Sequence, residues 1–193
     1  MAIRARTFRC RCRSRSSRSS CGRVRPAVHG PAVQPVAGRV DVKYFSGTAA
    51  YSTVFSLPPE TPARGRRLYL DLGDVQVMAD VKLNGKELGI LWKPPYRVDV
   101  TDAVQAGENR LEVSVVNLWI NRLIGDEQLP DDSPRANGMT LSQWPQWLLE
   151  GKPSPTGRFT FTSHRLWKKG DPLVASGLIG PVLLRAAQET RQE

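Results

Sequence analysis

Short runs of alternating apolar and polar residues recur from residue 49 onward, and they constrain the fold more than any other feature of the chain. In RLYLDL, from Arg67, leucines at every second position are separated by Tyr69 and Asp71. RLEVSVV, from Arg110, repeats the alternation. A period of two turns one face of a strand toward a core and the other toward solvent. Similar runs at 49–57, 77–85, 96–101, 157–167 and 177–187 predict an all-β domain of about eight strands.

Glycine, proline and asparagine separate these runs. The segment LNGKELG contains Asn84-Gly85, a pair that favours the positive φ angles of a two-residue type I′ hairpin. The chain has no long amphipathic helix pattern, and many short strands with Gly and Pro turns are typical of two packed sheets. We therefore predict a jelly-roll β-sandwich over residues 40–187, followed by a C-terminal tail at 188–193.

The net charge of +10 comes from the start of the chain. Residues 1–40 contain ten arginines and no acidic residue, whereas residues 41–193 hold 18 basic and 18 acidic residues. Nucleic-acid binding by counterion release needs basic side chains gathered on a folded surface, so we expect no nucleic-acid partner for the domain. Cys10, Cys12 and Cys21 also precede residue 40, which leaves the domain without a disulfide framework or a thiolate metal site.

Residues 1–39 are predicted to be a disordered Arg- and Ser-rich tail with a Pro-, Gly- and Ala-rich linker, because this composition cannot build a core. Three origins stay open for the tail: an organellar targeting segment, an RNA-binding arm, or translation from a wrong start or frame. Its positive segment is not followed by the apolar stretch of a secretory signal. No run approaches the roughly 20 apolar residues of a membrane span, so we expect no membrane partner.

Several motifs resemble carbohydrate-active proteins. Residues 79–117, ADVKLNGKELGILWKPPYRVDVTDAVQAGENRLEVSVVN, resemble the galactose-binding-like domain of glycoside hydrolases such as β-galactosidases and β-mannosidases, which is a jelly roll. A fuller set resembles glycoside hydrolase family 106, whose members are α-L-rhamnosidases and their relatives. It covers nearly all of residues 42–186 and consists of VKYFSGTAAYSTVFSLP, LGILWKPPYRVDVTDAV, NLWINRLIGDEQLPDD, WPQWLLEGKPSPTGRFTFTSHRLW and SGLIGPVLL.

The resemblance implies an ancillary, non-catalytic domain that supports a catalytic domain and contacts a glycan containing L-rhamnose. In such enzymes the catalytic glutamates lie on a separate barrel domain, so the alternative is a piece of a glycosidase whose barrel lies outside this chain. Members of the family are often secreted or periplasmic. Glycoside hydrolysis needs two carboxyl groups about 5–10 Å apart, and no pair here is marked for that role. We assign no catalytic residue and expect no activity from the chain alone.

Aromatic residues are the candidate binding residues. Trp92, Tyr96 and Arg97 lie at the end of a predicted strand and are candidate sugar contacts, because aromatic faces stack on sugar rings. Three further tryptophans belong to the long segment between Leu118 and Gly157 and are candidates for docking on a partner domain: Trp119, Trp144 and Trp147. Burial within the fold is the alternative for most of these side chains.

One dense acidic cluster follows Trp119. Its carboxylate oxygens suit a structural calcium ion, and a solvated acidic loop is the alternative. The cluster consists of Asp126, Glu127, Asp131 and Asp132. We expect no other cofactor.

Overall fold

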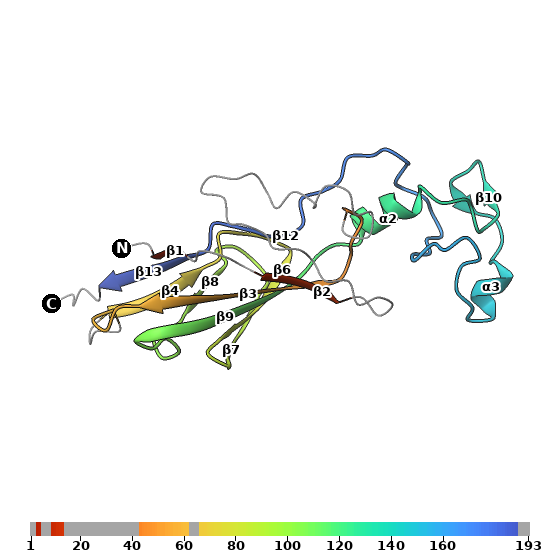
Figure 1. Cartoon of the computed structure of the whole chain (residues 1–193). Helices are drawn as coiled ribbons and strands as arrows, with labels where there is room; N and C mark the ends of the chain where they lie inside the picture. Colours follow the sequence, from red (N-terminus) through yellow and green to blue (C-terminus); the bar gives the residue numbers. More distant parts are fainter. Residues whose placement is uncertain (1–2, 5–8, 14–42, 62–65, 189–193) are drawn as a thin grey trace. The chain divides into compact units, whose positions relative to one another are not determined.

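The computed structural model describes residues 3–4, 9–13, 43–61 and 66–188 (Figure 1). The chain forms two compact units. The first unit includes Gly47–Leu118 and the segment from Ala175 onward, and the second includes Trp119–Val174. Every strand pair in both units is antiparallel.

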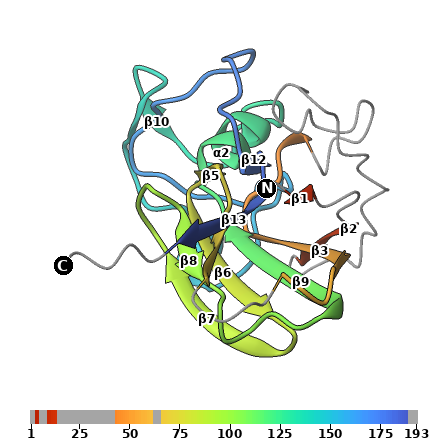
Figure 2. The same ribbon diagram turned by 90° about the vertical axis from the view of Figure 1, so that its left-hand side faces the viewer.

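The first unit is the predicted β-sandwich (Figures 1 and 2). One sheet has five strands in the order β2-β3-β9-β6-β7, and the other has four in the order β1-β13-β4-β8. A two-stranded sheet pairs β12 with β5. The bounds are β1 Ile3–Arg4, β2 Arg9–Arg13, β3 Thr48–Leu57, β4 Arg66–Asp71, β5 Asp74–Gln76, β6 Met78–Leu83, β7 Lys86–Leu91, β8 Arg97–Asp99, β9 Gly107–Val116, β12 Gly177–Gly180 and β13 Leu183–Gln188.

Alternation along the strands builds the core of the sandwich. In β9, every second residue from Asn109 to Val115 is buried, and in β6 the same holds from Ala79 to Leu83. The four-stranded sheet contributes Leu68, Leu70 and Leu184, all almost fully buried. Removing these apolar faces from water is the main source of stability for the unit. The predicted all-β sandwich is therefore confirmed.

The turn between β6 and β7 forms as predicted. Asn84 and Gly85 have φ angles of 53° and 81°, as a type I′ hairpin requires. The Asn84 side chain also donates to the Ala103 carbonyl and accepts from the Arg110 backbone N–H. It thus connects the hairpin to the segment that leads into β9.

Part of the segment predicted to be a disordered tail is described. Strand β1 pairs with β13, and β2 pairs with β3 in a register that runs from Arg9 opposite Ser52 to Arg13 opposite Thr48. These two stretches extend each of the two large sheets by one strand. The rest of the predicted tail and linker, and the residues at 189–193, lie outside the described residues.

Between Trp119 and Val174, the second unit contains two short helices, α2 (Ile120–Asp126) and α3 (Gln146–Leu149), and a small hairpin of β10 (Arg135–Ala136) and β11 (Thr140–Leu141). The strand predicted at 157–167 does not form there; this stretch has one isolated bridge, from His164 to Thr140. Two of its backbone N–H groups donate to a carboxylate instead. No helix among the described residues is long and apolar enough to cross a membrane.

Candidate functional site

Trp92 is the most exposed aromatic side chain of the sandwich. It follows directly after β7, and 65% of it is exposed. The Lys93 ammonium lies 5.1 Å from the centre of its ring, within the range of a cation–π contact. Much of the ring surface therefore faces solvent, and the role of Trp92 as a sugar contact stays a prediction.

Tyr96 was predicted to contact sugar, but its ring does not face solvent. The residue is buried, and its hydroxyl donates to the Val77 carbonyl oxygen at 3.0 Å. The apolar ring of Tyr96 is thus buried, and its polar hydroxyl group has a hydrogen-bond partner within the protein. Tyr96 therefore belongs to the core of the sandwich.

Arg97 takes part in an ion-pair cluster around Asp71. The Asp71 Oδ2 atom lies 3.0 Å from Arg97 Nη2 and 2.8 Å from Arg185 Nε, and its Oδ1 atom accepts from the Gly73 N–H. Burial acts to raise the pKa of Asp71, but the Gly73 hydrogen bond and the two guanidinium groups lower it below its ordinary value. The Arg97 side chain is partly exposed, yet its charge is already paired.

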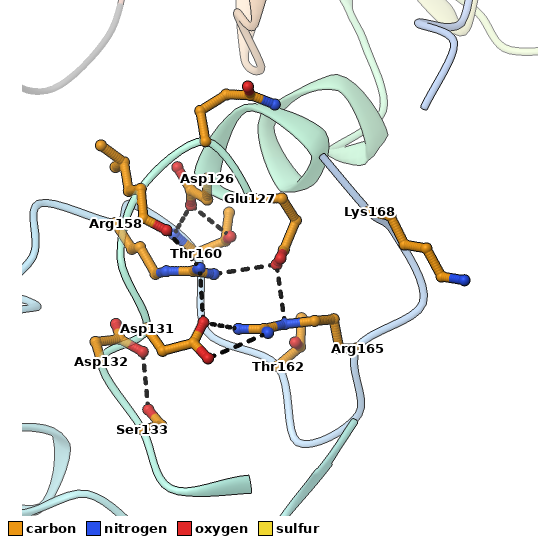
Figure 3. A network of polar contacts seen from close by, with 12 residues as sticks. Asp126, Glu127, Asp131, Asp132, Ser133, Arg158, Thr160, Thr162, Arg165 and Lys168 are labelled. Atoms are coloured by element: carbon orange, nitrogen blue, oxygen red, sulfur yellow. Dashed lines mark hydrogen bonds and ion pairs between the residues drawn. The ribbon is translucent and has the colours of Figure 1, made fainter. Parts of the chain in front are cut away.

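The acidic cluster of the second unit is paired with arginines (Figure 3). Asp126, at the end of α2, is 2% exposed. Its Oδ2 atom accepts from the backbone N–H groups of Phe159 and Thr160 at 2.9 and 2.7 Å and from the Thr160 hydroxyl at 2.6 Å. One buried carboxylate therefore holds the 157–167 stretch against α2, where the alternating sequence predicted a strand.

Glu127 and Asp131 continue this arrangement through two shared arginines. Glu127 Oε1 lies 3.0 Å from Arg158 Nη1 and 3.2 Å from Arg165 Nε. Asp131 pairs with both guanidinium groups, and its hydrogen bond with Arg165 lowers the pKa of Asp131 and raises that of Arg165. We call Asp126, Glu127, Asp131, Arg158, Thr160 and Arg165 the arginine–acid network.

The acidic cluster was predicted as a calcium site, with a solvated acidic loop as the alternative. Within the described residues, no group of three or more His, Cys, Asp and Glu side chains is placed to hold a metal ion. Asp132 accepts from the hydroxyls of Ser133 and Ser154. The network instead joins its carboxylates to arginines, a hydroxyl group and backbone N–H groups. Its evident role is to fix the conformation of the second unit.

The three tryptophans predicted to dock on a partner lie in this unit. Trp119 and Trp144 are 65% and 57% exposed, whereas Trp147 is half-buried. Trp144 and Trp147 flank Phe161, with ring centroids 5.7 and 5.9 Å away. The Trp147 indole N–H donates to the Asp132 carbonyl. Trp144 precedes α3, so the pair meets through Phe161 and not along one helical face.

Several residues of the network escaped the sequence prediction. Arg158, Thr160 and Arg165 are about thirty positions from their acidic partners in the sequence. Arg158 and Thr160 alternate with Phe159 and Phe161, which indicated a strand with one polar face. The arginines that follow the dense acidic cluster were the available signal, but charge spacing alone does not specify which side chains meet.

The fold defines the class of protein: a galactose-binding-like β-sandwich. The chain belongs to the glycosyl hydrolase 2 galactose-binding domain-like family, whose model matches residues 36–156. The predicted galactose-binding-like domain of a glycoside hydrolase is therefore confirmed. The matching family model is that of glycosyl hydrolase 2, whereas the fuller set of sequence motifs had pointed to family 106.

Three relatives illustrate the similarity. The "Putative beta-glucuronidase" of Formosa agariphila is 49% identical over 148 residues, which are 77% of this chain and 13% of that protein. The rhamnosidase of Novosphingobium sp. PP1Y is 30% identical, with a TM-score of 0.70, over 97% of this chain and 15% of that one. The β-glucuronidase of Bifidobacterium dentium shares the fold, with a TM-score of 0.59 and 20% identity over 97% of this chain and 29% of that one. The chain thus spans a small part of each relative.

Proposed function

We propose that this chain is an ancillary, non-catalytic carbohydrate-binding domain of a rhamnosidase-type glycoside hydrolase. The observation that carries the proposal is the 30% identity to the Novosphingobium rhamnosidase over 97% of this chain. The exposed Trp92 supports a direct contact with glycan, because its ring offers an apolar face for the C–H groups of a sugar. Arg97 is a candidate cation for hydroxyl groups, and its guanidinium also pairs with Asp71.

The catalytic domain of such a hydrolase is the proposed partner of the second unit. Trp119 and Trp144 expose large apolar surfaces that fit a docking interface, in which aromatic residues are enriched. Trp147 supports this surface from beneath through Phe161 and Asp132. On this proposal the catalytic carboxylates belong to the docked domain, and the present chain contributes none.

A glucuronide-cleaving enzyme is the second candidate for the parent protein. It is favoured by the 49% identity to the Formosa protein named for that activity. Under either candidate, the chain is a piece of a glycosidase whose catalytic barrel lies outside it. The two candidates differ in the sugar: a neutral deoxy sugar in one and an acidic uronate in the other.

Two measurements on the 193-residue chain test the proposal. Incubation with 4-nitrophenyl α-L-rhamnoside and 4-nitrophenyl β-D-glucuronide should release no nitrophenol above the buffer control. Calorimetric titration should show saturable binding of rhamnose-containing oligosaccharides and none of glucuronate. Hydrolysis would contradict the non-catalytic role, whereas binding of glucuronate alone would favour the second candidate.

A further inference from the structure

The outer face of the five-stranded sheet carries an apolar patch at one end. In β6 the residues Ala79, Val81 and Leu83 are buried in the core, so Met78 and Asp80 lie on the opposite face. The strand register places Met78 opposite Val116 and Asp80 opposite Ile90. Side chains from three neighbouring strands, β7, β6 and β9, therefore meet on this face.

These side chains are unusually exposed for their size. Ile90 is 59% and Val116 is 38% exposed, and Met78 is half-buried between them. Trp92 directly follows β7, two residues beyond Ile90, and is 65% exposed. Contiguous apolar patches on a protein surface mark binding sites. Three strands span about 10 Å at the usual strand spacing, a width that suits one or two sugar rings.

A carboxylate lies within this apolar row. Among the described residues, Asp80 makes no hydrogen bond and no direct ion pair, although it interacts electrostatically with Lys82, two residues along β6. Its cross-strand neighbour on β9 is Ser114. An ionised carboxylate has several acceptor sites and binds two neighbouring hydroxyl groups well. We call Met78, Asp80, Ile90, Trp92 and Val116 the outer-face patch.

We propose that the outer-face patch is the glycan site, and that it takes a neutral 6-deoxyhexoside in preference to an acidic sugar; this rests on the proposed function. The apolar C–H face and the methyl group pack on Trp92, Ile90 and Met78, and vicinal hydroxyls donate to Asp80. A uronate would bring its own carboxylate close to that of Asp80, and like charges repel. A hexose with a hydroxyl at C6 would bury that hydroxyl against apolar side chains without a partner.

The test is calorimetric titration of the 193-residue chain and two variants, Trp92→Ala and Asp80→Asn. Both changes are at solvent-accessible positions, and circular dichroism verifies that the variants fold. Glu112→Gln is the matched control, since Glu112 also lies on this face in β9 and pairs with Arg110. The ligands are methyl α-L-rhamnoside, methyl α-L-mannoside, which adds only the C6 hydroxyl, and methyl β-D-glucuronide.

Each variant at the patch should weaken rhamnoside binding by about tenfold or more, the equivalent of one lost contact, while Glu112→Gln binds as the unmodified chain does. The mannoside should bind several-fold more weakly, and the glucuronide not detectably. Rhamnoside binding that survives both patch variants would overturn the site and leave the proposed function intact. If the unmodified chain bound none of the three glycosides, both the site and the glycan contact of the proposed function would be wrong.

Discussion

Asn109 shows how one polar side chain is accommodated inside the sandwich. It is fully buried, and its Oδ1 atom accepts from Asn84 Nδ2 and from the Gln105 N–H. Its Nδ2 atom donates to the carbonyl groups of Gln105 and Gly107. Asn84 and Gln105 lie outside the strands, so the Asn109 amide supplies them with hydrogen bonds that a neighbouring strand would otherwise provide.

We expect Asn109→Ala to lower the free energy of unfolding by about 1–3 kcal/mol, because Gln105 and Asn84 would lose partly buried hydrogen bonds to the amide. Urea unfolding followed by circular dichroism measures the change. Glu108→Ala, at an exposed neighbouring position, is the control and should stay within about 0.5 kcal/mol. Equal effects of the two substitutions would show that the amide contributes little.

The lowered pKa of Asp71 makes a pH-dependent contribution to the stability of the sandwich. Its folded pKa lies below the unfolded value of about 3.9. The contribution is therefore complete above that value and is lost as the pH falls through the folded pKa. We expect the unfolding free energy of Asp71→Asn to fall less steeply below about pH 4 than that of the unmodified chain. Urea titrations at several pH values test this, and identical slopes would contradict it.

At the scale of elements, Asp126 replaces a missing strand pairing. Its carboxylate holds the 157–167 stretch by three hydrogen bonds, and it lies at the end of the helix that follows the sandwich. We expect Asp126→Ala to destabilise the second unit by about 3–5 kcal/mol, since buried donors and the guanidinium of Arg122 would lose a charged partner.

Amide hydrogen exchange measures this effect locally. The Phe159 and Thr160 amides should lose their protection in Asp126→Ala, while the amides of β9 in the sandwich should keep theirs. Asp171→Ala, at a position with a local turn contact, is the control and should leave both regions unchanged. Protection of Phe159 and Thr160 that survives the loss of the carboxylate would contradict the role of Asp126.

Helix α2 contains a glycine for a packing reason. A Cβ atom at Gly125 would lie 2.6 Å from Tyr44 Cβ and 2.9 Å from Arg122 Nη2, closer than atoms pack. Alanine favours a helix by about 1 kcal/mol over glycine, but the overlap should outweigh this gain and make Gly125→Ala destabilising by about 1–3 kcal/mol. Thermal unfolding measures the sign, and a stabilised variant would show that Tyr44 moves freely.

At the scale of the whole molecule, the sequence predicted what depends on local periodicity. The alternation in β4, β6 and β9 and the Asn84-Gly85 turn specified the sandwich, because burial of one strand face and positive φ angles are properties of a few adjacent residues. The stretch at 157–167 was mispredicted because its partner is a buried aspartate 33 residues earlier. Tyr96 was mistaken for a surface residue because an aromatic before a strand has the same pattern whether it points inward or outward.

Charge is distributed unevenly along the chain, and this has a measurable consequence. Residues 1–40 carry ten arginines without an acidic residue, and residues 41–193 are balanced. Affinity for a polyanion depends on the number of cations that displace counterions.

We expect the full chain to bind heparin or RNA at low salt with an affinity that falls steeply as salt rises, and a chain of residues 40–193 to bind neither. Salt-gradient elution from a heparin column compares the two, with circular dichroism to verify that the shorter chain folds. If the folded shorter chain were also retained on the column, the polyanion-binding surface would lie on the domain, and the prediction would be wrong.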